Sequence, residues 1–415
     1  MRTLLAIGVL GFLAAGASAG DWAEFRGPTG QGHAADSKLP IEWSSSKNVA
    51  WKTGVAGLGW SSPIVVGNRI FLTTAVPTGE GEKKDQSLRA ICLDAATGKS
   101  QWDIEVFLQD GKTASPIHSK NSHASSTPVS DGKHVFVHFG THGTACLTLD
   151  GQIVWQNREL KYEPRHGNGG SPILVDDILV VSCDGSNTMF VIALDKVTGK
   201  VRWRTPREHK NGSKFSFGTP LLIEVNGEKQ IVAPGTFHVA GYRPKDGGEI
   251  WRVDYGQGYS VIPRPVFGHG LIFLSSGYDT PVLMAIKPDG QGNVTETHVA
   301  WKTNKSAPHT PSPLLVGEHL YVVSDGGIAT CFEAKTGEQV WQKRVGGNFS
   351  SSPLFADGKI YLQSEQGDGI VLQPGSEYVE LAKNELEPRT FASYAVAGGA
   401  LLIRTETQLY RIQQP

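Results

Sequence analysis

The chain has 415 residues, with 39 basic and 40 acidic side chains, a formal net charge of -1 and 39% hydrophobic residues. This balance excludes a surface dominated by positive charge, so we expect neither nucleic acid nor an anionic membrane as the main partner. The 50 glycines fall between short apolar segments, which is typical of turns that connect strands.

Residues 1–19 have the three parts of a secretory signal. Arg2 supplies the positive charge, residues 4–15 form a short apolar run, and Ala17-Ser18-Ala19 is a small-residue cleavage site. The run is too short for a membrane-spanning helix, and no later segment is long and apolar enough. We therefore predict export to the periplasm or the extracellular space after cleavage near Ala19, with no transmembrane segment.

Residues 20–46 are interpreted as an N-terminal extension, and residues 47–415 as one repeat domain. Seven tryptophans recur at intervals of 40 to 53 residues, which is the spacing of a repeat architecture. They are Trp51, Trp102, Trp155, Trp203, Trp251, Trp301 and Trp341. The copy from Ala193 to Trp203 reads A-x-D-x-x-T-G-x-x-x-W. Its Asp and Gly are turn residues, and its Trp is placed to bridge neighbouring sheets.

A second repeated element consists of Ser or Thr, then Pro, then a short apolar run. Its copies begin at Ser62, Thr127, Ser171, Thr219, Arg264, Ser312 and Ser352, and a degenerate eighth copy begins at Ser393. Proline suits the start of a strand, where its missing N–H does no harm. A turn and further β-rich segments follow each copy, so each unit is expected to form a four-stranded sheet.

Four-stranded sheets repeated radially predict an all-β fold, an eight-bladed β-propeller with antiparallel blades. The last unit lacks an outer strand, and residues 47–52 are predicted to supply it by joining the C-terminal blade. An open stack or a seven-bladed ring is the alternative. The cysteines Cys92, Cys146, Cys183 and Cys331 are either unpaired and buried or include one bridge, Cys92–Cys146.

The A-x-D-x-x-T-G-x-x-x-W repeat resembles that of the pyrroloquinoline-quinone (PQQ) type propellers. These include quinoprotein alcohol dehydrogenases and BamB, the propeller subunit of the outer-membrane barrel-assembly machine. The resemblance implies adjacent cysteines over the cofactor in the dehydrogenases, and this chain has none. We therefore expect no cofactor, with PQQ as the alternative, and no catalytic residue is carried over.

Two sets of loops are expected to share one face of the ring and to surround the mouth of its central channel. Loops leading into the inner strands bring Trp60, His123, His166, Asn168, Lys214, Phe215, Tyr259, Arg264, His309 and Asn348. Loops between second and third strands bring His142, Asp184, His238, Tyr278, Asp279 and Asp325. A second feature near the mouth is the long insert at residues 105–122, which is placed to cover part of it.

From these groups we predict a ligand-binding mouth made of Trp60, His123, His142, His166, Asn168, His238, Tyr259, Arg264, Tyr278, Asp279, His309 and Asn348. No spacing motif joins the histidines, so we predict no metal site. Ordinary hydrogen bonding in a wet propeller mouth is the simpler interpretation of these side chains.

Three functions remain open. The first is a non-catalytic binding or scaffold protein of the cell envelope, monomeric, with protein or peptide partners. The second is a periplasmic quinoprotein-type oxidoreductase that binds PQQ in the mouth. The third is a carbohydrate-binding or carbohydrate-active propeller, with Trp60, Tyr259 and Tyr278 as stacking platforms for a glycan.

Overall fold

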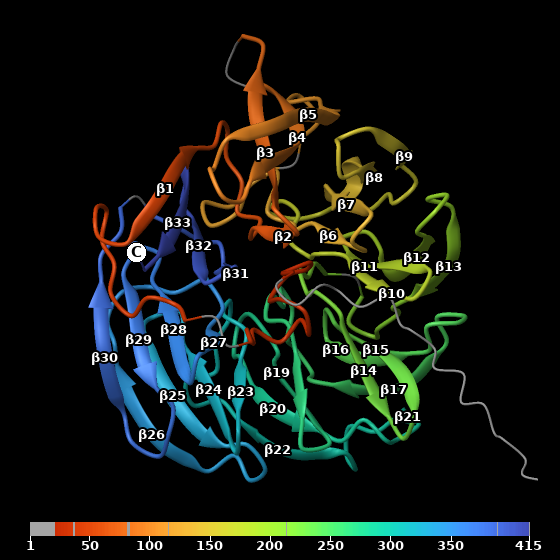
Figure 1. The fold of residues 1–415 in the computed structure, drawn as a ribbon. Coiled ribbons are helices and arrows are strands. Elements are labelled where there is room, and N and C mark those ends of the chain that lie inside the picture. The colour runs from red at the N-terminus through yellow and green to blue at the C-terminus, as the bar shows by residue number, and fades with distance from the viewer. Residues whose placement is uncertain are drawn as a thin grey trace, which may run out of the picture.

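The computed structural model describes residues 21–414 apart from 36–37, 81–83, 115, 213 and 388. The predicted signal segment, residues 1–19, lies outside the described residues. Within the described ranges the chain forms eight sheets arranged in a ring, each built on four antiparallel strands, and one of them has a short fifth strand at its edge (Figure 1). This confirms the predicted eight-bladed β-propeller.

The first four blades follow one another along the chain, and each runs from an inner strand to an outer strand. Their strands are β2 (Ile64–Val66), β3 (Arg69–Thr78), β4 (Asp85–Asp94) and β5 (Ser100–Gln109); β6 (Val129–Ser130), β7 (His134–His138), β8 (Thr144–Thr148) and β9 (Ile153–Asn157); β10 (Ile173–Val175), β11 (Ile178–Asp184), β12 (Met189–Asp195) and β13 (Val201–Pro206); and β14 (Leu221–Val225), β15 (Glu228–Pro234), β16 (His238–Tyr242) and β17 (Glu249–Asp254). A short 3-10 turn, η1 (Gly140–His142), joins β7 to β8.

The next three blades have the same order. Their strands are β18 (Val266–Gly268), β19 (Leu271–Ser275), β20 (Leu283–Ile286) and β22 (Val299–Thr303); β23 (Leu314–Val316), β24 (His319–Val323), β25 (Ile328–Glu333) and β26 (Gln339–Arg344); and β27 (Leu354–Ala356), β28 (Lys359–Gln363), β29 (Gly369–Gln373) and β30 (Val379–Asn384). A two-residue strand, β21 (Gly292–Asn293), pairs in parallel with β17 at the edge of the fourth blade.

The eighth blade combines the first strand of the chain with the last three. It contains β31 (Ala395–Ala397), β32 (Ala400–Arg404), β33 (Gln408–Gln413) and β1 (Val49–Gly54). Strand β1 pairs antiparallel with β33, so that Lys52 faces Tyr410 and Gly54 faces Gln408. The outer strand of the last blade therefore comes from the N-terminal side of the repeats, which leaves that sheet with the same four-strand build as its neighbours.

The repeated tryptophans fasten each blade to the next. Six of them donate a hydrogen bond from Nε1 to a main-chain carbonyl in the turn of the following blade, at 2.8–3.1 Å; they are Trp51, Trp102, Trp155, Trp203, Trp301 and Trp341. The turn glycine lies against the ring. A Cβ on Gly199 would be 2.5 Å from the Trp155 ring, and the φ of Gly199 is +71°. The Thr-Gly pair of the repeat therefore makes room for the preceding tryptophan.

A ring of hydroxyl groups joins the inner strands. We call it the hydroxyl belt; its members precede the inner strands and are Ser62, Thr127, Ser171, Thr219, Ser312, Ser352 and Ser393. Each accepts a hydrogen bond, at 2.9–3.1 Å, from the main-chain N–H at the same position of the preceding blade. Arg264 occupies this position in the fifth blade, and its Nε donates instead to Pro220 O at 2.9 Å.

Residues 21–35, which we call the N-terminal strap, lie in the centre of the ring, where Figure 1 draws them in red. Trp22 forms an antiparallel bridge with Val65 of the first blade, and His33 forms a parallel bridge with Phe355 of the seventh. From the sixth blade, Pro313 O accepts a hydrogen bond from Arg26 Nη2 at 2.8 Å. The strap therefore connects inner strands that lie on different sides of the ring.

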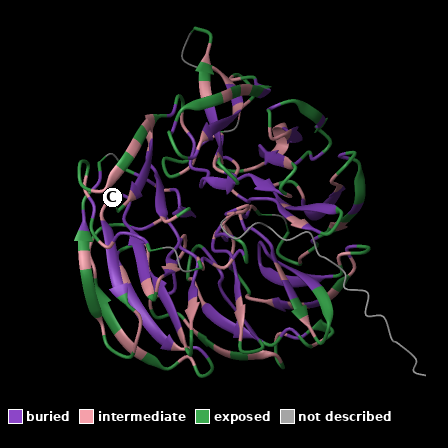
Figure 2. Ribbon diagram, viewed as in Figure 1, coloured by how far each residue is buried: buried purple, intermediate pink, exposed green. Residues whose placement is uncertain are grey.

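Burial follows the radial order of the strands (Figure 2). Inner and middle strands are mostly buried, and exposed residues concentrate on the outer strands. The apolar clusters lie between neighbouring blades; in one of them, Ile173 and Trp203 of the third blade pack with Ile231 and Tyr242 of the fourth. The four cysteines are buried and free.

Candidate functional site

A pocket of about 590 Å³ lies at the channel mouth on one face of the ring. Its residues come from the loops that lead into the inner strands, from two loops between second and third strands, and from the strap, which contributes Phe25. All seven members of the hydroxyl belt line it as well. The strap thus forms part of the pocket wall, where the channel would otherwise continue between the inner strands.

Period-two alternation in the loops places a second ring of residues in the pocket. These residues lie two positions before the belt position, and in blade order they are Trp60, Ser125, Gly169, Phe217, Ile262, Thr310, Ser350 and Phe391. Successive side chains of an extended chain point to opposite sides, so positions two apart share one side. All eight blades therefore contribute to the pocket from equivalent positions.

Six aromatic side chains follow one another around one side of the mouth. Each ring centroid is 5.2–5.9 Å from the next, and most of the contacts are edge-on or tilted. We call this group the aromatic arc; its members are His118, His166, Phe215, Tyr259, Tyr278 and His309. Two further rings, Trp60 and Phe391, meet edge to face at 4.7 Å. Because aromatic pairs favour such geometries, the arc forms a preorganised apolar wall.

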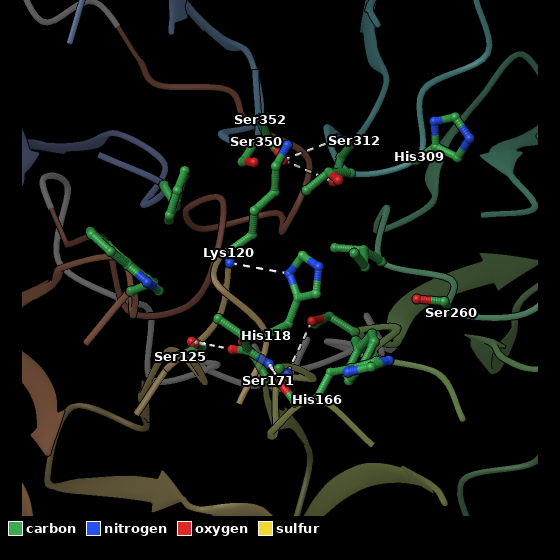
Figure 3. Close-up of a pocket in the computed structure, with 18 of the residues that line it drawn as sticks. His118, Lys120, Ser125, His166, Ser171, Ser260, His309, Ser312, Ser350 and Ser352 are labelled. Carbon is green, nitrogen blue, oxygen red and sulfur yellow. Dashed lines mark hydrogen bonds between the residues drawn. The ribbon is translucent and has the colours of Figure 1, made fainter. Parts of the chain in front are cut away.

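Lys120 crosses the mouth. Its Nζ is 2.7 Å from Glu365 Oε1, which also accepts a hydrogen bond from Ser350 at 2.6 Å. Figure 3 shows the Lys120 side chain extending past His118 toward Ser350. Its main-chain N–H donates to His118 Nδ1 at 3.2 Å. The insert that carries Lys120 is therefore attached to the seventh blade across the pocket.

Two polar groups that line the pocket, Asp325 and His166, have pKa values displaced by their surroundings. Burial acts to raise the pKa of Asp325, but hydrogen bonds from His309 and Thr310 lower it on balance. Asp325 Oδ2 accepts the main-chain N–H of His309 at 2.7 Å. Burial, followed by the charges of His118 and Arg165, lowers the pKa of His166. At neutral pH the mouth thus contains an ionised Asp325 and a neutral His166.

Five of the twelve predicted mouth residues line the pocket: Trp60, His166, Tyr259, Tyr278 and His309. The other seven lie outside its lining: His123, His142, Asn168, His238, Arg264, Asp279 and Asn348. Arg264 is buried against the strap, where its Nη2 is 2.9 Å from Glu24 Oε2. His238 is buried at the start of β16, and its pKa is lowered to about 3, first by burial and then by Arg207.

The remaining predicted residues make local contacts around the mouth. His142 ends η1, and burial, together with His123, lowers its pKa to about 4. Asn168 accepts a hydrogen bond from the Tyr162 hydroxyl at 2.6 Å. The main-chain oxygen of Asn348 accepts a hydrogen bond from the N–H of Glu365 at 2.7 Å. Asp279 is exposed, with a φ of +75°.

Several lining residues were not among those predicted from the sequence: Phe25, His118, Lys120, Phe217 and Phe391. Phe217 and Phe391 lie two residues before Thr219 and Ser393, so the repeat register itself contained the signal that identifies them. His118 and Lys120 belong to the insert expected to cover part of the mouth. No repeat pattern could place Phe25, because the strap precedes the repeats.

Among the residues that the structure describes, no group of three or more His, Cys, Asp or Glu side chains is arranged to hold a metal ion. In the same ranges, no helix has the length and apolar character needed to cross a bilayer.

The sequence of the repeats matches a known family. A family model described as "Outer membrane protein assembly factor BamB" matches residues 34–179, 92–312 and 235–376. The chain belongs to this family. It is also 28% identical, over 115 residues, to the outer membrane protein assembly factor BamB of Burkholderia pseudomallei (strain K96243). The matched segment is 27% of this chain and spans only 29% of the length of that relative.

Solved structures share the fold at low sequence identity. BamB from Moraxella catarrhalis superposes with a TM-score of 0.53 and 16% identity, over 82% of this chain and 87% of that one. A europium-containing methanol dehydrogenase superposes with a TM-score of 0.66 and 11% identity, over 94% of this chain and 89% of that one. At these identities the likeness concerns the fold alone.

Proposed function

We propose that this chain is a BamB-type propeller of the cell envelope that binds a ligand in the mouth pocket without transforming it. The observation that carries the proposal is the aromatic arc around a concave pocket of about 590 Å³. Pockets of this size, with apolar walls and a few polar groups, are typical ligand sites. Family membership supports an envelope location and partners in the envelope.

The charged side chains of the mouth are held by other groups of the protein, which supports ligand binding rather than catalysis. Lys120 is paired with Glu365, and Asp325 accepts main-chain hydrogen bonds from His309 and Thr310. A general acid or base needs a free path to the proton that it transfers. In this arrangement the polar groups hold the loops in place, and the exposed ring faces are left to contact a ligand.

Site-specific photo-crosslinking in the native envelope tests this function. A photoreactive amino acid replaces Tyr278, whose exposed fraction is 55%, and in a control protein it replaces Val197, exposed by 71% on the third blade. We expect a discrete crosslinked product from the Tyr278 position and none from Val197. Equal products at both positions, or no product at the mouth, would contradict a binding function there.

PQQ is a planar tricarboxylate, and the residues of the pocket do not fit it. Burying three carboxylates requires compensating cations. Among the described lining residues, Lys120 is the one Lys or Arg, and it is already paired with Glu365. We derive no oxidoreductase step from this site. Purified protein mixed with PQQ and calcium should show neither bound-cofactor absorbance nor dye reduction with an alcohol or a sugar.

A further inference from the structure

Aromatic rings and hydroxyl groups make up most of the lining of the mouth pocket. Of the 26 described residues that line it, ten carry aromatic rings, histidines included, and eleven carry a Ser or Thr hydroxyl. The rings gather in the arc and in the Trp60–Phe391 pair, and the hydroxyls form the belt and the positions next to it. A ligand that fills the pocket must therefore satisfy both an apolar wall and a dense set of hydrogen-bonding groups.

The belt hydroxyls have defined hydrogen-bonding roles. Each oxygen already accepts a main-chain N–H, so its own O–H group remains as a donor. The structure shows one such hydroxyl donating to another, Ser352 to Ser312 at 2.9 Å. Near the arc, Asp325 supplies a carboxylate acceptor. The pocket thus offers hydrogen-bond donors at the hydroxyl belt and a carboxylate acceptor near the arc.

The formal charge of the pocket is close to neutral. Lys120 and Asp325 are the Lys, Arg, Asp or Glu side chains among the described lining residues, and Glu365 pairs with Lys120. An anionic ligand such as a phosphate, a nucleotide or an acidic peptide would meet no unpaired cation. A purely apolar side chain would strip water from the belt without replacing its hydrogen bonds. These two arguments leave a neutral ligand that is apolar on its faces and rich in hydroxyls at its edges.

We propose that the mouth pocket binds a neutral oligosaccharide, one sugar ring of which enters the pocket. The proposal rests on the proposed function and gives its ligand a chemical class. A pyranose ring presents C–H groups on its faces, which pack against aromatic rings, and hydroxyls at its edges. Tyr259 and Tyr278, with ring centroids 5.8 Å apart, form the platform on one wall. The Trp60–Phe391 pair forms a second platform.

In the bound state the carboxylate of Asp325 accepts hydrogen bonds from sugar hydroxyls. The belt hydroxyls donate to the sugar oxygens that point into the narrow part of the pocket. Phe25 of the strap lines the pocket and the strap lies in the centre of the ring, so we expect the pocket to take the end of a chain instead of threading a chain through the ring.

Titration calorimetry on the full mature protein tests this assignment. The probes are neutral trisaccharides of β-1,4-glucose, α-1,4-glucose, β-1,4-xylose and β-1,4-N-acetylglucosamine. An anionic trigalacturonate and the amide of N-acetyltryptophan are the comparison ligands. We expect saturable one-to-one binding of at least one neutral trisaccharide, and at least tenfold weaker binding of both comparison ligands.

Two variants and a matched control locate the site. Tyr259→Ala and Tyr278→Ala should each weaken trisaccharide binding at least tenfold while the melting temperature changes little, because both rings lie on the rim. Tyr378→Ala removes a ring of the same kind that packs on Trp341, remote from the mouth, and should leave affinity unchanged. Equal losses in all three variants would overturn the assignment.

The calorimetry also separates this proposal from the proposed function. If no neutral trisaccharide binds, or if the tryptophan amide binds more tightly, the oligosaccharide assignment is overturned. A crosslinked product at position 278 would in that case leave the binding function standing with a peptide as its ligand. If the product is absent and no ligand binds, both proposals fall.

Discussion

Arg264 Nη2 lies 2.9 Å from Glu24 Oε2, and this ion pair joins the inner strand of the fifth blade to the N-terminal strap. The same guanidinium donates to the main-chain oxygens of Phe25 and Pro220. It therefore places hydrogen-bond donors where the other blades place an accepting hydroxyl, and it holds Phe25, the strap residue that lines the pocket. One side chain serves both the ring and the mouth.

Replacing Arg264 with Ala should destabilise the protein strongly. The change leaves Glu24 without its partner in a site where burial already raises the pKa of that carboxyl. Removing one partner of a buried pair costs about 3 kcal/mol or more. Urea denaturation measures the loss. Arg389→Ala, which breaks the exposed pair with Glu406, is the control and should cost under about 1 kcal/mol. Similar small losses in both variants would show that the strap contact is not structural.

Gly199→Ala should lower the free energy of unfolding by more than the strain of its backbone conformation alone explains. A positive φ strains alanine by about 1 kcal/mol, and the contact with Trp155 at 2.5 Å adds about 1–3 kcal/mol of overpacking. Gly132 has a φ of +83° and open space where a Cβ would lie. Gly132→Ala should therefore lose only the stability that the backbone strain of alanine costs. Denaturant midpoints of the two variants give the comparison. Equal losses would argue against the tryptophan contact between blades.

Ser171→Ala should show what one belt hydrogen bond contributes. The change leaves the buried N–H of Thr127 without its acceptor, which costs about 1–3 kcal/mol. Ser171→Thr keeps the hydroxyl, and Thr127 and Thr219 already carry threonine at the equivalent position. We expect Ser171→Thr to remain near wild-type stability in a thermal melt. If the two variants melt together below wild type, the volume of the side chain matters and the hydroxyl does not.

Acidification should destabilise the protein through His138. This ring is buried in β7, and burial lowers its pKa to about 3. The unfolded chain, with a pKa near 6.5, binds more protons than the native state in this range, so stability is full above about pH 6.5 and falls as the pH drops toward 3. The slope reaches about 1.4 kcal/mol per pH unit for each such histidine.

His138→Gln should flatten this dependence. Denaturation at pH 7.5 and pH 5 measures the difference, and the variant should lose less stability between the two values than the wild type. His134, half-exposed at the other end of the same strand, is the control position for a Gln substitution. Parallel pH profiles for wild type and His138→Gln would contradict the buried neutral ring.

Much of this fold can be predicted from the sequence because the sequence is repetitive. Evenly spaced tryptophans and Ser/Thr-Pro starts fix eight equivalent sheets, because each copy repeats the same turn and the same inter-blade contact. The loops that carry the arc follow from that register. What departs from the register is harder to predict. The strap precedes the repeats, and Lys120 lies in an insert between two blades. Arg264 stands at a belt position where the other blades have Ser or Thr, and its longer side chain reaches the strap.

Individual loop residues also depend on local backbone geometry that no repeat specifies. The sequence predicts His238 and Tyr278 on loops of the same face, yet His238 is the first residue of the buried strand β16, while Tyr278 is exposed at the rim. The preceding residue, Phe237, has a φ of +69°, a backbone conformation that the repeat pattern does not specify. Sequence position alone therefore predicts which face a loop is on, and not which side chains line the pocket.

A crystal structure of the protein grown with the tightest-binding neutral trisaccharide tests the central claim most directly. We predict density for a sugar ring in the mouth, packed on Tyr259 and Tyr278, with its hydroxyls toward Asp325 and the hydroxyl belt. A sugar bound on the outer wall of the blades, with the mouth filled by water alone, would contradict it.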